Sequence, residues 1–493
     1  MTRKTPMPHH YRDEIPLLPG ANGFLGHAQA IRNDRFTLFE TIANTQRDMN
    51  LLKLGSEYVI TLSGPEALRE VLVHKWKSFT KSASIRVLLY PLIGNGVVTS
   101  DADVWHRSRK LMAPLFQPSY LTANADGIVQ CIRQWIDGLK EGDEIDVVDE
   151  ATRLTMNVVS KALFDLDTTS HAAELIGALG VVLEEVSRQA ISTGLLFKSA
   201  GVDALEKLEG RLPGFLERAR AGTLNTLRQP FPLPTRSSRQ YREALATVHS
   251  LVDHMIAERR KSGLHRHDFL TRLLTARDED DGATMSDKQV RDEILTLFFT
   301  GHETTAVAMT WALVSLSQRA DILARVKQEV AILEGRAPSV EDLSKLPYSL
   351  RVLKEAMRLY PSVPMFDRIA KEDVEIGGHS LPRGTMLFVL PYALHRRPDI
   401  YANPHEFDPD RFLPDAEESR HRLAYLPFGA GPRICIGVHF ALMEAQFALA
   451  MIMQRLTLTA LPSDITPSNL AFFRPVEPFK MKIERKLEEG ACA

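Results

Sequence analysis

The chain has 493 residues, of which 44% are hydrophobic and 25% are charged, as in an ordinary globular protein with a substantial core. A net charge of −2 gives no reason to expect nucleic acid or an anionic membrane surface as a general partner. No repeat, low-complexity tract or long Gly/Ser linker divides the sequence. A single large folded unit is therefore expected.

The first 30 residues are polar and are interrupted by four prolines. They contain no apolar run long enough for a signal peptide or a membrane anchor. The three cysteines are scattered through the chain, which agrees with a reducing compartment. The sequence therefore predicts a cytoplasmic protein without a membrane span.

The pattern of turns and apolar residues predicts a mainly α-helical chain with small β-sheets. Two short strands flank Gly55-Ser56, and a helix follows at Pro65. A second strand pair flanks Gly377-Gly378, with residues 385–390 as its continuation. Helical periodicity dominates elsewhere, especially over the ranges 151–180, 239–261 and 321–333.

Residues 104–110, VWHRSRK, form a basic segment after the first strands. Trp105 and Arg109 are four residues apart, so they share one face of a helix. His106 and Lys110 add further polar and cationic groups. A solvated basic turn is the alternative explanation for these last two residues.

The segment from Ile191 to Ser238 is less regular, and QPFPLPTRSS is its clearest loop. Its apolar side chains would contact a lipophilic substrate or a membrane surface if they were exposed. The side chains in question are Leu195, Leu196, Phe197 and Phe231. The alternative is an insertion that folds onto its own core.

A long helix is predicted from Ser286 to Gln318. Ser286 and Gln289 form a capping-box signature at its start. The residues that follow are apolar on all sides, as in a buried helix. At 1.5 Å per residue, the helix would span roughly 50 Å.

The middle of this helix breaks the local rules for a buried helix. Gly301 costs about 1 kcal/mol of helix stability, and the neighbouring Thr304 and Thr305 are poor helix formers. His302 and Glu303 add polar groups at the same place. Such violations tend to mark functional sites. The structural alternative is close packing of another helix at Gly301, with threonine hydroxyls bonded to the preceding turn.

Glu355 and Arg358 are three residues apart in a helix predicted between Pro347 and Pro361. They therefore share one helix face. On their own, they describe a solvated ion pair worth roughly 0.3 kcal/mol.

Cys435 lies in the stretch FGAGPRICIG, residues 428–437, where glycines allow tight turns and Gly437 opens an apolar helix. A thiol at a helix N-terminus is favoured as a thiolate, which is a metal ligand or a nucleophile. Cys131 and Cys492 stand at no C-x-x-C or zinc-finger spacing from it. This leaves ligation of one large cofactor by a single thiolate, with Arg433 as an anchor for an anionic group. Haem, with one iron and two propionates, fits, and a structural cysteine is the alternative.

The whole stretch resembles the haem-binding loop of the cytochrome P450 family, and the matching residues are Phe428, Gly429, Gly431, Arg433, Cys435 and Gly437. The resemblance implies heme b as the cofactor and Cys435 as the iron ligand. It runs from about Leu51 to Ile483, which suggests an N-terminal segment, 1–50, packed on a haem-thiolate domain, 51–493. Microsomal members of the family carry an N-terminal anchor, so the polar N-terminus suggests the soluble bacterial type.

By the same resemblance, the middle of the long helix is the family's oxygen-binding groove, usually written Ala/Gly-Gly-x-acid-Thr. Gly301 would leave room for dioxygen, and Thr304 and Glu303 would organise the protons that cleave the O–O bond. Thr300 departs from this pattern, because the family usually has Ala or Gly there. Its hydroxyl and methyl groups would narrow the pocket or supply a further hydrogen bond.

The resemblance also assigns side chains that hold the haem propionates and the loop. Trp105 and Arg109 would bind one propionate, with His106 as a candidate to share that task, and Arg368 would be a further propionate ligand. Arg411, in the segment FDPDRF, would pair with the buried Glu-x-x-Arg motif and so fix the loop that carries Cys435.

The predicted substrate pocket is largely apolar, which indicates a lipophilic small molecule such as a fatty acid, terpenoid, steroid or polyketide. By position, its lining comes from the segment 85–98, the long helix, the segment after the Glu-x-x-Arg helix and the C-terminal region. The named candidates are Phe298, Phe299, Thr300, Met365, Phe366 and Phe472.

The function implied by the resemblance is that of a monooxygenase, which inserts one atom of dioxygen into the substrate and reduces the other to water. No reductase follows Ile483, so electrons are expected from a separate ferredoxin or flavodoxin and its NAD(P)H reductase. The expected docking residues are Arg107, Lys110, Arg351 and Lys354. Two alternatives are a haem-thiolate isomerase or dehydratase, against which the Glu303-Thr304 pair argues, and a non-catalytic haem sensor or electron carrier.

Overall fold

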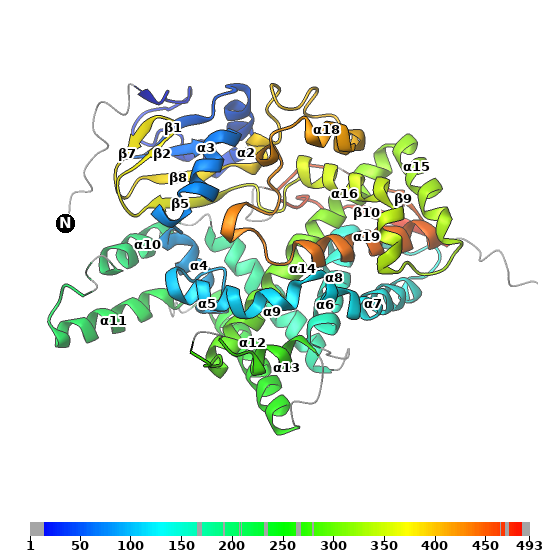
Figure 1. The fold of residues 1–493 in the computed structure, drawn as a ribbon, viewed down its shortest axis with the longest axis horizontal. Helices are drawn as coiled ribbons and strands as arrows, with labels where there is room; N and C mark the ends of the chain where they lie inside the picture. The colour runs from blue at the N-terminus through cyan, green and yellow to red at the C-terminus, as the bar shows by residue number, and fades with distance from the viewer. Residues whose placement is uncertain are drawn as a thin grey trace, which may run out of the picture. The chain divides into compact units, whose positions relative to one another are not determined.

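The computed structural model describes residues 14–164, 170–190, 193–206, 208, 210–230, 235–262, 268–278, 281–463, 465–468 and 473–485. The chain divides into two compact units, and each is described by itself. Unit 1 comprises Met1–Thr80, Ile132–Thr152 and Thr304–Ala493, and unit 2 comprises Lys81–Cys131 and Arg153–Glu303. Figure 1 gives the labels of their helices and strands.

The strands of the described residues all belong to unit 1, where they form three sheets. The largest sheet has the order β1-β2-β8-β5-β3, with β1 Met49–Leu54, β2 Glu57–Leu62, β8 Met386–Val389, β5 Phe366–Ala370 and β3 Phe79–Thr80. The second has the order β4-β10-β9, with β4 Glu144–Asp146, β10 Lys480–Arg485 and β9 Leu456–Ala460. The third is a hairpin of β6 Val374–Ile376 and β7 His379–Leu381.

Both predicted strand pairs are confirmed, but the strand β8 has other partners than the pattern predicts. The first pair turns at Gly55-Ser56 and the second at Gly377-Gly378. The sequence predicts β8 as a continuation of the second pair. Instead, β8 pairs in parallel with β2 and antiparallel with β5. The side-chain pattern of a strand shows which face is buried and leaves its partner open, because pairing depends on contacts distant in sequence.

The helices of unit 1 are α2 Ala28–Asn44, α3 Pro65–Arg69, α15 Ala320–Val330, α16 Pro347–Leu359, α17 Pro391–Leu394, α18 Pro414–Glu418 and α19 Val438–Arg455. Among these helices, α2 lies beside β1 and α19 lies beside β9 (Figure 1). A π-helical turn, Glu70–His74, follows α3. Proline opens α3, α16 and α17, where its missing N–H leaves no helical hydrogen bond unmade.

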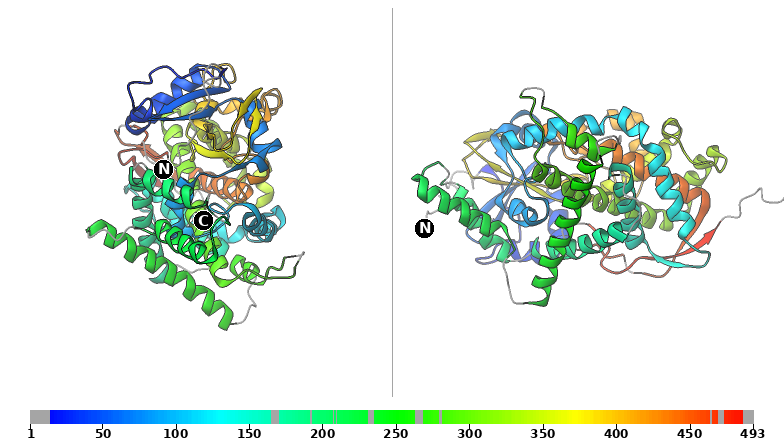
Figure 2. Two further views of the ribbon diagram at one scale, coloured as in Figure 1. Left: turned by 90° about the vertical axis from the view of Figure 1, so that its left-hand side faces the viewer. Right: turned by 90° about the horizontal axis from the view of Figure 1, so that it is seen from below.

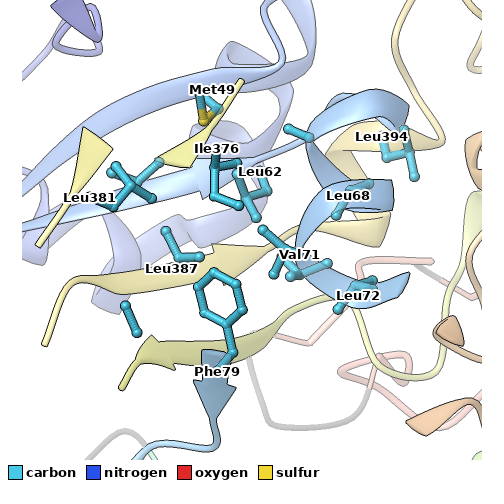
Figure 3. Packing of buried hydrophobic residues seen from close by; sticks show 14 of the residues in the cluster. Met49, Leu62, Leu68, Val71, Leu72, Phe79, Ile376, Leu381, Leu387 and Leu394 are labelled. Atoms are coloured by element: carbon cyan, nitrogen blue, oxygen red, sulfur yellow. The ribbon is translucent and has the colours of Figure 1, made fainter. Parts of the chain in front are cut away.

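Two hydrophobic clusters form the core of unit 1. Figure 3 shows the first, in which Leu62, Leu387 and Phe79 of the five-stranded sheet meet Leu68 and Val71 of the helical segment that follows β2. The second joins α2 to β1, to the start of α17 and to the C-terminal region, and it contains Leu38, Phe39, Leu52, Leu390 and Phe473. The described residues before β1 are therefore part of the core of unit 1.

The elements of unit 2 among the described residues are helices, apart from one isolated β-bridge between Arg277 and Thr284. Its helices are α4 Ala83–Ile93, α5 Ala102–Met112, α6 Pro118–Ala123, α9 Ser170–Ala190, α10 Thr193–Glu206, α11 Gly214–Arg228, α12 Arg236–Lys261 and α13 Phe269–Thr275. Three helices are shared between the two units along the chain, α7 Ala125–Gly138, α8 Val147–Phe164 and α14 Asp287–Gln318. Across the described residues, no helix is both long enough and apolar enough to cross a membrane.

The prediction of a long helix between 286 and 318 is confirmed by α14, which has 32 residues. Its capping box is present, because the Ser286 N–H donates to Gln289 Oε1 at 3.0 Å and the Gln289 N–H donates to Ser286 Oγ at 3.3 Å. The range 151–180, predicted as one helical stretch, contains parts of the two helices α8 and α9.

The prediction of an irregular segment between 191 and 238 is wrong, because α10 and α11 occupy most of it (Figure 2). Glu206 at the end of α10 holds this region together by contacting Arg86 of α4 at 2.6 Å and Arg228 of α11 at 2.8 Å. Leu195 is buried, which favours packing onto the protein's own core. The side chains of Leu196 and Phe197, and the residue Phe231, lie outside the described part of the chain.

Candidate functional site

The loop that carries Cys435 is closed by its own backbone. The Cys435 N–H donates to the carbonyl of Phe428 at 2.9 Å. Gly431 has a φ of +69°, and a Cβ atom there would lie 1.9 Å from the carbonyl oxygen of Leu72, so both the conformation and the packing require glycine. Gly437 caps the following helix, α19. The thiol is therefore presented on an exposed, well-defined turn just before a helix N-terminus.

Glu355 and Arg358 of α16 are completely buried and form a bidentate ion pair. Arg358 Nε and Nη2 donate to the two Glu355 oxygens at 2.7 and 2.8 Å. Arg411 Nε lies 3.4 Å from Glu355 Oε1, so the predicted grouping of three side chains is present. Arg358 also donates to three backbone carbonyls between residues 395 and 406, at 2.7 to 3.1 Å. The sequence pattern alone describes a solvated pair, and the structure shows a buried network instead.

His395 connects this network to the Cys435 loop. Its Nε2 accepts the Leu426 N–H at 2.8 Å, and its Nδ1 donates to the carbonyl of Arg358 at 3.1 Å. Burial, together with the nearby Arg358 cation, lowers the pKa of His395 to about 3, so the ring is neutral. Leu426 lies two residues before Phe428. The start of the loop is thus fixed to α16 through one imidazole ring, for which the sequence gives no recognisable signal.

Arg368 and Arg433, the predicted anion-binding arginines of unit 1, occupy different elements. Arg368 lies on β5 opposite Leu387, and its guanidinium stands 5.0 Å from the ring centroid of Phe366. Arg433 ends a short helical turn two residues before Cys435. Unit 1 therefore carries the exposed thiol and two of the predicted propionate ligands.

Thr304 belongs to the part of α14 that is assigned to unit 1. Its carbonyl accepts the Ser362 hydroxyl at 2.7 Å. Ser362 follows α16 in the segment that carries predicted pocket residues, so this bond ties the segment to the helix. Sequence analysis misses Ser362, because a serine between two prolines is an ordinary loop signal.

In unit 2, α8 packs closely against α14 at Gly301. A Cβ atom on Gly301 would approach Val159 Cγ2 to 3.2 Å. The Thr155 hydroxyl donates to the carbonyl of His302 at 3.0 Å, and the Thr300 hydroxyl donates to the carbonyl four residues earlier at 2.8 Å. The close approach of Val159 agrees with the structural alternative of helix packing at Gly301, and the role of Thr300 in the substrate pocket stays a prediction.

His302 and Glu303 are both buried, and their side chains face each other. The His302 Nδ1 donates to the carbonyl of Phe298, which can only accept. The other ring nitrogen, Nε2, lies 3.8 Å from Glu303 Oε2. A proton carried by either of these two groups therefore has the other group as a near neighbour.

The basic segment of unit 2 forms α5, which confirms that Trp105 and Arg109 share a helix face. Trp105 is buried, and its ring centroid is 4.7 Å from that of His106. Burial of the aromatic ring holds this face of α5 in a defined orientation.

The four cations predicted to form a docking surface all have carboxylate partners within their own units. In unit 2, Arg107 and Lys110 contact Asp278 at 3.7 and 3.2 Å. In unit 1, Arg351 and Lys354 contact carboxylates at 2.9 and 2.8 Å. The fold therefore brings acidic residues to these four cations from distant parts of the sequence, and their role in docking a redox partner stays a prediction.

The predicted pocket residues have different environments. Phe298 is fully buried and stacks on Phe164 with a centroid distance of 4.5 Å, so its observed role is in the core of unit 2. Phe299 is also buried, whereas Met365 and Phe366 are partly buried beside the two hydrophobic clusters of unit 1. Phe472 lies outside the described residues.

The side chains that could bind a metal in unit 1 suit an ion that is coordinated mainly by a cofactor and needs only one ligand from the protein. Within the described ranges, no group of three or more His, Cys, Asp or Glu side chains is arranged to hold a metal ion. What unit 1 offers is one exposed thiol, with a guanidinium two residues away. A thiolate with a neighbouring cation fits an iron porphyrin that carries carboxylates, so the residues present fit haem.

Comparison with known proteins gives a consistent picture. A family model described as Cytochrome P450 matches residues 16–483. The match begins earlier than the start near Leu51 that the resemblance suggests.

Two curated relatives come from Streptomyces. The chain is 33% identical to Cyclooctatin synthase of Streptomyces melanosporofaciens over 465 residues, which cover 94% of this chain and 93% of the relative. It is 31% identical to Pentalenene oxygenase of Streptomyces avermitilis over 460 residues, which cover 92% and 93%. Among solved structures, the heme domain of cytochrome P450DA superposes with a TM-score of 0.80 at 25% identity, covering 96% of this chain and 98% of the other.

Proposed function

Because the chain belongs to the cytochrome P450 family of haem-thiolate, oxygen-incorporating oxidoreductases, we propose that Cys435 ligates the haem iron and that the substrate is a cyclic terpenoid. The observation that carries the proposal is the closed turn in which the exposed Cys435 thiol precedes α19. Haem, when bound, supplies the redox-active iron at which dioxygen is activated. The helix N-terminus and the glycine turn favour the thiolate form of Cys435.

In this proposal, four further side chains bind the haem propionates. Arg109, with the buried Trp105 on the same helix face, binds one propionate. Arg368 and Arg433 supply further guanidinium groups for the propionates. His106, beside Trp105, is a candidate to assist Arg109. Guanidinium groups suit this task because their planar fork meets a carboxylate through two hydrogen bonds.

Proton delivery is assigned to α14. The Thr304 hydroxyl would hold and deliver a proton that cleavage of the O–O bond requires, and the Glu303 carboxyl would replace that proton. The contact of Glu303 Oε2 with His302 Nε2 supports this assignment, since the ring offers a neighbouring group with which a proton can be exchanged. Gly301 permits the close packing of α8 that holds this turn of the helix.

The substrate class rests on the relatives and on the apolar candidate residues. Two relatives at 31% and 33% identity are named for pentalenene and cyclooctatin, which are cyclic terpenoids. In the proposed pocket, Phe299, Met365 and Phe366 exclude water from an apolar ring system, and Thr300 limits the size of the substrate.

The electrons come from a separate ferredoxin or flavodoxin with its NAD(P)H reductase. The scattered cysteines support a cytoplasmic location.

A substrate panel tests the proposal. Cyclic terpene hydrocarbons and alcohols, linear fatty acids, steroids and polyketides are titrated against the purified haem protein while the Soret band is followed. Turnover is then measured with a ferredoxin or flavodoxin, its reductase and dioxygen. The cyclic terpenoids are expected to shift the band and to gain one oxygen atom from dioxygen. Tighter binding and faster oxygenation of fatty acids or steroids would contradict the substrate class, and rearrangement without dioxygen uptake would favour an isomerase or dehydratase.

A further inference from the structure

Two acidic side chains of α14 lie outside every motif discussed so far. Asp292 and Glu293 precede the oxygen-groove sequence by two turns, and they are only 3% and 1% exposed. Buried carboxylates are retained when they accept hydrogen bonds, so their partners indicate what they do. All of these partners lie in unit 2, together with α4 and α5.

Asp292 holds the end of α4. Its Oδ2 accepts the Asn95 N–H at 2.9 Å and is paired with Lys288 at 2.8 Å. Gly94 has a φ of +50°, and a Cβ atom there would lie 2.4 Å from the Asp292 carboxylate. The conformation and the close approach both require glycine, so the sequence at the end of α4 is adapted to this carboxylate.

Glu293 holds the next part of the same segment and also α5. Its Oε2 accepts the Val97 N–H at 2.9 Å, and the buried Ser108 hydroxyl of α5 donates to the carboxylate as well. Lys81 also holds this segment, because its ammonium group donates to the carbonyls of Val97, Val98 and Ser100 at 2.6 to 3.2 Å. One carboxylate thus joins three elements, namely α14, the segment 94–100 and α5.

Ser108 occupies a sensitive position on α5. It is adjacent to Arg109 and three residues after Trp105, so a displacement of Ser108 moves the turn of helix that carries both side chains. A hydrogen bond that is lost in a buried place leaves its partner unsatisfied and is costly, which makes the Glu293 carboxyl an effective anchor for this turn.

We propose that Asp292 and Glu293 form a carboxylate latch that fixes the segment 94–100 and α5, and that Glu293 is thereby a positioning residue for the haem-binding side chains of α5. The inference deepens the proposed function, because it rests on the role of Trp105 and Arg109 in holding a haem propionate. Glu293 acts on the haem only through Ser108 and the turn of α5.

The test uses the haem-loaded protein and three variants of the latch. Glu293→Ala removes the hydrogen bonds to Val97 and to Ser108, whereas Ser108→Ala removes only the bond between Glu293 and α5. Glu293→Gln keeps an oxygen that can accept from the Val97 N–H and adds an N–H group that can donate to the Ser108 oxygen. The rate of haem dissociation is measured by the transfer of haem to apomyoglobin. Local opening of the backbone is measured by peptide-resolved hydrogen exchange. The matched control is Asp342→Ala, because Asp342 of unit 1 is a buried carboxylate that likewise accepts a serine N–H and hydroxyl, both at 2.9 Å.

The latch predicts that Glu293→Ala and Ser108→Ala each raise the haem dissociation rate by about tenfold, the effect of losing one such hydrogen bond. The double variant is expected to dissociate no faster than Glu293→Ala, and Glu293→Gln to restore the wild-type rate. Exchange at Val97 should rise in Glu293→Ala and stay unchanged in Ser108→Ala. Asp342→Ala is expected to lower the unfolding midpoint without accelerating haem loss.

Haem dissociation at the wild-type rate in both Glu293→Ala and Ser108→Ala would overturn the latch, as would an equal acceleration by Asp342→Ala. If Glu293→Ala does not fold, Ser108→Ala alone decides by the same criterion. Arg109→Ala separates the two proposals. If Arg109→Ala leaves the rate of haem dissociation unchanged, the assigned role of Arg109 fails. The latch is then tested by hydrogen exchange along α5, which must be faster in Ser108→Ala than in the wild type.

Discussion

Burial raises the pKa of the Glu293 carboxyl to about 7, and the neighbouring Asp292 opposes its ionisation further, while Ser108, Val97 and Lys81 favour the charged form. In the unfolded chain, the pKa of a glutamate is 4.5. Between these two values the folded state binds more protons, so the free energy of unfolding falls as the pH rises. From pH 5.5 to 7.5, this one group lowers the stability by about 2 kcal/mol.

Glu293→Gln removes the titration and keeps the hydrogen bonds. The stability of the wild type relative to this variant is therefore expected to decrease by about 2 kcal/mol as the pH rises from 5.5 to 7.5. Urea unfolding of both proteins at several pH values measures the difference, and other titrating groups cancel in the comparison. A stability difference that does not change with pH would show that Glu293 does not titrate in this window.

Thr304→Ala tests the proton-donating hydroxyl on α14. Loss of the hydroxyl is expected to lower the fraction of consumed dioxygen that appears in product by roughly tenfold or more, with substrate binding unchanged, because a positioned acid contributes to proton transfer only. The adjacent, buried Thr305 provides the matched control, Thr305→Ala. Product yield and dioxygen uptake are measured together. Equal coupling in the two variants would remove the assigned role of Thr304.

Helix α16 and the Cys435 loop are joined through His395, so this ring determines how well the loop is held. His395→Ala leaves the Leu426 N–H and the carbonyl of Arg358 without this partner in a buried place. We expect the free energy of unfolding to fall by about 3 kcal/mol, from the desolvation cost of two such groups, and haem dissociation to accelerate.

The control for this change is His249→Ala in unit 2. His249 is partly buried and contacts one carbonyl, that of Leu92, at 3.1 Å. This contact lies within unit 2, whereas the Cys435 loop belongs to unit 1, so the removal of His249 is expected to cost stability without changing haem dissociation. Urea unfolding and haem transfer measure the two effects. Unchanged haem dissociation in His395→Ala would contradict the proposed coupling.

The elements that the sequence predicts well are those with local signals. The capping box at Ser286 and the prolines before and after α16 set helix ends that the structure confirms. The partners of β8 and the helices α10 and α11 depend on contacts with distant segments, such as Glu206 with Arg86. Local propensity contains no information about such contacts, because tertiary packing routinely overrides it.

For the protein as a whole, the family and the cofactor follow from short motifs, and the matches to known proteins confirm both. The residues that support those motifs are harder to find in the sequence. His395, Ser362 and Glu293 act through backbone groups or through one hydroxyl, so no spacing rule identifies them. Charge compensation at Lys110 and Arg351 is equally invisible until the fold brings carboxylates to them.

The central claim is that Cys435 supplies the thiolate that holds the haem iron. The most direct measurement is the absorption spectrum of the reduced carbon monoxide complex of the wild type, of Cys435→Ser and of the control Cys131→Ala, which changes a buried cysteine of unit 2. The wild type and Cys131→Ala are expected to show the long-wavelength Soret band of a thiolate-ligated haem, and Cys435→Ser to lose it. An unchanged band in Cys435→Ser would contradict the assignment of the ligand and of the site built around it.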